Sequence, residues 1–107
     1  MNYKEIEEKL KEQVFQMELS EMLIWLAAEY SFISGQLEDI VVIKGKKWLS
    51  DRLHSKTDKE ADRKWQASEM GVNYEVYRLQ LKKIEKMIGA IRKRIEVLEK
   101  EREYSRI

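Results

Sequence analysis

One unbroken heptad pattern in the C-terminal half constrains the fold of this chain more than any other feature of its sequence. Ten apolar side chains follow one another at alternating spacings of three and four residues, which is the a/d spacing of four consecutive heptads. They are Ala67, Met70, Tyr74, Tyr77, Leu81, Ile84, Ile88, Ile91, Ile95 and Leu98. The pattern predicts a long, coiled-coil-like helix over residues 58–105, whose apolar seam must pack against other helices.

The remainder of the chain also predicts helices. Apolar residues at helical spacing predict a helix over 3–34, in which one stripe through Val14 gives way to a second. Gly35 is a plausible stop or bend, and a connector helix over 36–53 follows. The β-branched run over 40–43 also fits a short strand, but we favour a helix because a lone strand has no visible partner. Residues 54–57 form a polar loop, and Thr57 begins a capping-box pattern.

These elements predict an all-α fold, an antiparallel helical hairpin within a single helical domain over residues 1–107. One hairpin cannot cover the whole seam, so we expect another copy of the chain to cover the rest. We therefore predict an oligomer whose interface contains Leu23, Leu26, Leu81, Ile84, Ile88, Ile91, Ile95 and Leu98.

The composition argues against several function classes. The 107 residues contain no Cys and one His, which removes thiolate chemistry and most zinc and triad sites. There is no phosphate-binding loop and no hydrolase motif, so we predict that the protein is not an enzyme and has no cofactor or metal. The absence of Cys suits a cytoplasmic location. The most apolar stretch, residues 22–33, is too short to span a membrane.

Basic residues accompany tryptophan at two places in the chain. Residues 46–48 read Lys-Lys-Trp and residues 63–65 read Arg-Lys-Trp, on either side of the predicted loop. Cationic grooves with aromatic stacking platforms are typical of proteins that bind single-stranded nucleic acid. The predicted binding residues are Lys46, Lys47, Arg63, Lys64, Trp65, Lys82, Lys86 and Lys93. The alternative is that Trp48 and Trp65 belong to the core and that the lysines form a solvated face.

Two segments of the chain resemble small helical proteins of bacteriophage recombination gene clusters, the UvsY-type recombination mediators. They are residues 35–53 (GQLEDIVVIKGKKWLSDRL) and residues 60–101, which begin with EADRKWQASEMG. The resemblance implies an oligomeric accessory protein that binds single-stranded DNA in recombination or replication and helps a recombinase to load. A phage-encoded protein of this kind would act in the host cytoplasm. The alternative function is a helical protein-binding module, an adaptor or inhibitor of a host or phage protein, without nucleic-acid binding.

Overall fold

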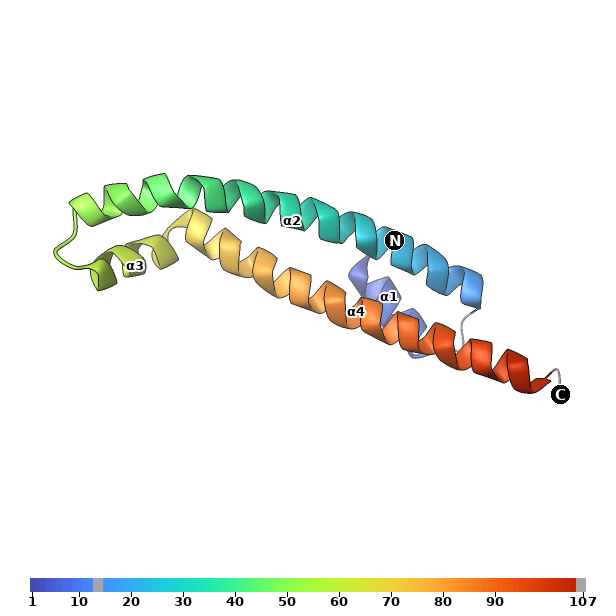
Figure 1. Ribbon diagram of the computed structural model, residues 1–107. Helices are drawn as coiled ribbons and strands as arrows, with labels where there is room; N and C mark the ends of the chain where they lie inside the picture. The colour runs from blue at the N-terminus through green and yellow to red at the C-terminus, as the bar shows by residue number, and fades with distance from the viewer. Residues whose placement is uncertain (13–14, 106–107) are drawn as a thin grey trace. The chain divides into compact units, whose positions relative to one another are not determined.

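The computed structural model describes residues 1–12 and 15–105, and these residues form four α-helices and no strand. α1 spans Tyr3–Leu10, α2 spans Gln16–Leu53, α3 spans Asp58–Ala67 and α4 spans Glu69–Ser105 (Figure 1). The prediction of an all-α fold is confirmed. Residues 40–43 lie inside α2, which confirms the helical interpretation of that run.

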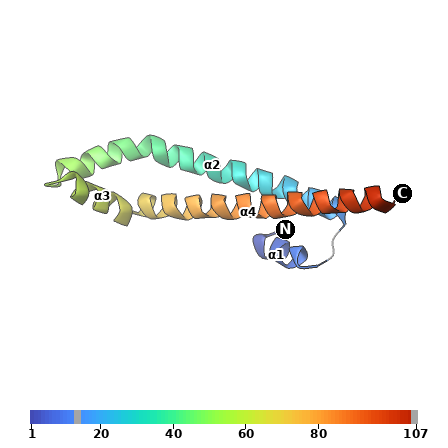
Figure 2. The same ribbon diagram turned by 60° about the horizontal axis from the view of Figure 1, so that its bottom comes forward.

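The chain divides into two compact units. The terminal unit contains Met1–Tyr30 and Lys82–Ile107, and the central unit contains Ser31–Leu81. α2 and α4 each contribute one segment to each of the two units. Within each unit the α2 and α4 segments run antiparallel (Figure 2). The antiparallel hairpin is therefore confirmed, whereas a single domain over 1–107 stays a prediction.

The terminal unit is built around a core to which α1, α2 and α4 all contribute. Its fully buried large side chains are Ile6, Leu19, Met22, Leu26, Ile84 and Ile91. Tyr3 fixes α1 on this core. Its ring packs edge-on against the Trp25 ring, with 5.1 Å between the ring centroids, and its hydroxyl donates a hydrogen bond to the Glu29 carboxylate at 3.1 Å. Lys83 of α4 pairs with Glu7 at 3.2 Å and lies over the Tyr3 ring. Along the sequence, Met1–Tyr30 carries 7 acidic and 3 basic residues, whereas Lys82–Ile107 carries 9 basic and 5 acidic residues. Attraction between these two segments therefore operates within the chain.

The predicted single helix over 3–34 is wrong, because α1 ends at Leu10 and α2 begins at Gln16. The guanidinium of Arg94 donates to the carbonyl oxygens of Leu10 and Glu12, which satisfies acceptors at the end of α1. The change from one apolar stripe to another therefore marks two separate helices. Val14 of the first stripe lies outside the described residues.

The predicted stop at Gly35 is also wrong, because α2 continues through that residue. The connector helix predicted over 36–53 is consequently the second part of α2 and no element of its own. Nothing in the backbone at Gly35 requires glycine, since no glycine of the described chain has a positive φ. Among the described residues, no helix combines the length and the apolar character needed to cross a bilayer.

The predicted long helix over 58–105 is divided at Ser68 into α3 and α4. Ser68 adopts an extended backbone, and its hydroxyl donates to the Trp65 carbonyl at 2.6 Å and accepts from the Gly71 amide at 3.1 Å. One side chain thus caps the end of α3 and the start of α4. The apolar spacing continues across this residue, so the heptad pattern alone gives no sign of the break.

Candidate interaction surface

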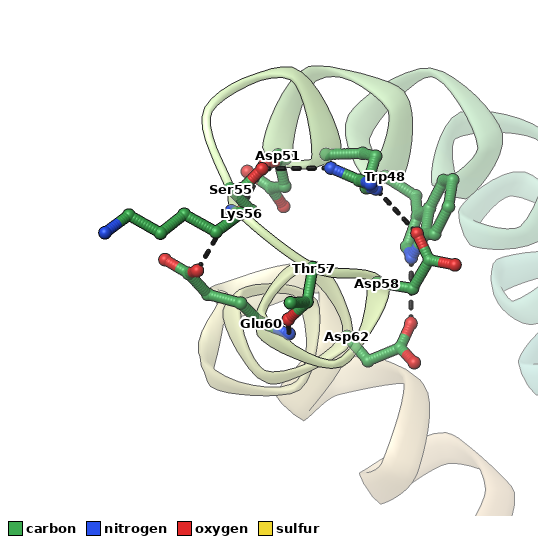
Figure 3. A network of polar contacts seen from close by, with 9 residues as sticks. Trp48, Asp51, Ser55, Lys56, Thr57, Asp58, Glu60 and Asp62 are labelled. Atoms are coloured by element: carbon green, nitrogen blue, oxygen red, sulfur yellow. Dashed lines mark hydrogen bonds and ion pairs between the residues drawn. The ribbon is translucent and has the colours of Figure 1, made fainter.

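The corner between α2 and α3 is held by a network of polar contacts (Figure 3). Thr57 caps α3 by accepting from the Glu60 amide at 3.2 Å, and the Glu60 carboxylate accepts from the Lys56 amide at 3.1 Å. The predicted loop over 54–57 and its Thr57 cap are therefore confirmed. The Glu60 carboxylate reaches the Lys56 amide, one residue before the amide that a capping box uses.

Two side chains of α2 tie this corner to α3. The indole N–H of Trp48 donates to Asp62 at 2.8 Å, and Arg52 pairs with Asp58 at 2.5 Å (Figure 3). Arg52 also donates to the Ser55 carbonyl at 2.9 Å. Trp48 is half-buried, and its polar edge is occupied by the contact with Asp62. It therefore helps to join α2 to α3.

Trp65 belongs to the core of the central unit, where only 5% of its surface is exposed. The ammonium of Lys44 lies 5.5 Å from the Trp65 ring centroid and 5.5 Å from that of Tyr74, so it bridges the two rings by cation–π contacts. Trp65 is therefore no exposed stacking platform in this structure, and its role in nucleic-acid binding stays a prediction. The heptad pattern places Ala67 on the apolar seam, but the break at Ser68 changes which face of α3 is buried, and Ala67 is exposed.

The basic residues predicted to bind nucleic acid are distributed over both units. Some of them form hydrogen bonds or ion pairs within the chain, and others do not. In the central unit, Lys47 pairs with Asp51 at 3.9 Å, and Lys64 donates to the His54 carbonyl at 2.9 Å. Five of the predicted binding cations are exposed and have no hydrogen-bond or ion-pair partner within the described part of the chain. These are Lys46 and Arg63 in the central unit, and Lys82, Lys86 and Lys93 in the terminal unit.

Charge is nearly balanced within each unit. The segments of the terminal unit contain 12 basic and 12 acidic residues, and the central unit contains 9 basic and 8 acidic residues. The strong charge gradient along the sequence is thus largely cancelled when the N-terminal and C-terminal segments meet. A polyanion would meet an acidic residue for nearly every basic one, which weakens long-range attraction to it.

Three residues of the predicted oligomer interface are buried within a single chain. Leu26, Ile84 and Ile91 have no exposed surface, because the terminal unit's own core takes them up. A second copy cannot reach them while that unit keeps its fold, and their assignment to an interface stays a prediction. The other predicted interface residues are half-buried, namely Leu23, Leu81, Ile88, Ile95 and Leu98.

Exposed apolar side chains gather instead in the central unit. A groove of about 480 Å³ is lined by Leu37, Glu38, Val41, Val42 and Tyr74. Large apolar residues that are at least 42% exposed occur on α2 and α4 of this unit, and they are Phe32, Val41, Val42, Ile43, Leu49, Leu53, Val72, Val76 and Leu79. The sequence contained a signal for this surface. Four consecutive β-branched residues at 40–43 lie on all sides of a helix. Because a helix that packs on one side can bury only some of them, the others are exposed.

Comparison with known proteins gives no relative from which a function can be transferred: neither a family model, nor a curated protein, nor a solved structure matches the chain. The described residues include no group of three or more side chains placed to hold a metal ion. The exposed surfaces and their charges are therefore the observations from which a function is argued.

Proposed function

We propose that the protein is a helical protein-binding module that acts through self-association of its central unit. The observation that carries this proposal is the exposure of nine large apolar side chains within a segment of 51 residues, Ser31–Leu81. Extended apolar surface on a protein that dissolves in water is typical of a site that another protein covers. Leu53 and Val42, at 84% and 75% exposed, are the most exposed members of the set.

Sedimentation equilibrium of the wild-type chain at micromolar concentrations tests this proposal. We expect a mass at a multiple of 12.9 kDa. Leu49→Asp should shift the population towards the monomer, because a carboxylate placed in an apolar contact loses its hydration. Ile24→Asp is the matched control, since Ile24 is 72% exposed but lies in the terminal unit. A wild-type protein that stays at 12.9 kDa at every concentration would contradict the proposal.

A second candidate function is binding of single-stranded nucleic acid in a recombination accessory role. The specific observation in its favour is that five of the predicted binding cations are exposed and have no partner in the described part of the chain, namely Lys46, Arg63, Lys82, Lys86 and Lys93. The burial of Trp65 and the balanced charge of both units favour the protein-binding proposal over it. A recombinase or other partner protein and a cytoplasmic location stay predictions.

Fluorescence anisotropy with a labelled single-stranded oligonucleotide separates the two candidates. Nucleic-acid binding should be strong at low salt and fall steeply as salt is added, because cations condensed on the phosphates are released. Arg63→Glu and Lys82→Glu should each then lower the slope of log affinity against log salt by about one. The protein-binding proposal predicts no binding at low salt and no effect of either substitution.

A further inference from the structure

One stripe of α2 in the central unit has no covering element among the described residues. Its members recur at spacings of three and four residues, which places them on one side of the helix. We call it the α2 outer face, and it consists of Ser31, Gly35, Glu38, Val42, Lys46, Leu49 and Leu53. Its three large apolar residues are strongly exposed, Val42 at 75%, Leu49 at 59% and Leu53 at 84%.

The two charged residues on this face are symmetric about Val42. Glu38 lies four residues before Val42 and Lys46 lies four residues after it. Both side chains are exposed, and neither has a hydrogen bond or ion pair with any other described residue. Each lies about 6 Å along the helix axis from Val42, at 1.5 Å per residue. A two-fold axis through Val42 would bring Glu38 of each chain opposite Lys46 of the other.

The sizes of the uncharged residues are also complementary about Val42. Gly35 lies seven residues before Val42 and Leu49 seven after it, while Ser31 and Leu53 lie eleven before and eleven after. In an antiparallel pair of α2 helices a small residue therefore meets a leucine at every one of these positions. A Cβ added at Gly35 would meet nothing within 4 Å, so the chain's own packing does not account for this glycine. The leucine of a second copy would occupy that space.

We propose that two copies of the protein pair antiparallel through the α2 outer face, with the two-fold axis at Val42 and reciprocal ion pairs between Glu38 and Lys46. The inference rests on the proposed function and names the face, the orientation and the register through which two copies associate. The occupant is a second copy because the face complements itself in charge as well as in size. A parallel pair would bring like charges together at both positions.

Charge reversal tests the pairing. Glu38→Lys alone places two lysines opposite each other at both ends of the pair, and Lys46→Glu alone places two glutamates there. Each single variant should dimerise about tenfold more weakly than wild type at low salt, because two attractive contacts become two repulsive ones. An equimolar mixture of the two variants should form heterodimers with about the wild-type affinity, since opposite charges then meet at both positions. The double variant should also recover the wild-type affinity.

Matched controls reverse charges elsewhere in the central unit. Glu75→Lys and Lys59→Glu change exposed residues that have no partner in the described chain, and both should dimerise as wild type does. Circular dichroism checks that every variant keeps its helix content. A wild type that does not associate overturns the proposed function together with this pairing. If the wild type associates but the mixture shows no gain over the single variants, the pairing is overturned and the proposed function stands.

Discussion

Substitution of Gly71 by alanine should destabilise the protein, although glycine is a poor helix former. A Cβ at this position would lie 1.9 Å from the carbonyl oxygen of Trp65 and 2.9 Å from its carbonyl carbon. These are backbone atoms, so rotation of a side chain cannot relieve the overlap. Ser68 also holds both partners in place, because its hydroxyl contacts the Trp65 carbonyl and the Gly71 amide. Relief therefore requires α3 to move away from α4.

The expected change in the free energy of unfolding is the balance of two opposing effects. Alanine gains about 1 kcal/mol over glycine in a helix. Overpacking in a well-packed site costs roughly 1–3 kcal/mol, and loss of the Ser68 cap costs about 1 kcal/mol more. The balance is a loss of roughly 1–3 kcal/mol for Gly71→Ala. Because a domain of this size loses about 4–8 °C of melting temperature per kcal/mol, the change is easily measured.

Gly89→Ala supplies the matched control, because a Cβ there meets nothing within 4 Å and only the helix gain remains. We expect this variant to be more stable than wild type by up to about 1 kcal/mol. The assay is thermal or urea unfolding followed by circular dichroism, at one protein concentration throughout, since association raises apparent stability. A Gly71→Ala protein that melts at or above the wild-type temperature would refute the reasoning.

Three further predictions concern Trp65, Tyr3 and Gly35. Trp65→Ala should lower the free energy of unfolding by about 3–5 kcal/mol in urea melts, because the indole is core; an exposed stacking residue would change it little. Burial, with the hydrogen bond to Glu29, raises the pKa of Tyr3 above 10.0, so the folded state holds this proton more tightly than the unfolded chain. The free energy of unfolding should therefore fall as pH rises from 10 towards that raised pKa, and Tyr3→Phe should flatten the fall; an identical pH profile in both proteins would contradict this. Gly35→Ala should weaken dimerisation measured by sedimentation, whereas Gly89→Ala should leave it unchanged; equal effects of the two would count against contact at Gly35.

The sequence predicts the helices well where the pattern is long and the turn chemistry is explicit. The heptads over residues 70–98 predict α4, and Thr57 marks the start of α3. The break at Ser68 escapes the pattern because Ala67 and Met70 are still three residues apart. A serine followed by an acidic residue is the N-cap signal that was present there. The end of α1 is bound by Arg94, which is more than 80 residues away and which no local pattern connects to Leu10.

The candidate site was harder to predict because it depends on which residues have partners. Lys46 and Lys47 are neighbours of the same type, yet Lys47 is paired with Asp51 and Lys46 is free among the described residues. The burial of Trp65 depends on the register of α3, which the break at Ser68 resets. Composition therefore indicates which residue types are present, whereas packing decides which of them a partner can reach.

Disulfide trapping at Val42 tests the central claim most directly. The chain has no cysteine, so Val42→Cys introduces a single thiol on the proposed two-fold axis. Two cysteines form a disulfide when their Cα atoms approach to about 4.4–6.8 Å, which close antiparallel packing at this axis allows. Val76→Cys, on an exposed valine of α4, is the control. We predict that mild oxidation converts Val42→Cys to a covalent dimer of unchanged helix content, while Val76→Cys forms no disulfide-linked dimer. Equal and slow cross-linking of the two proteins would contradict the antiparallel pairing.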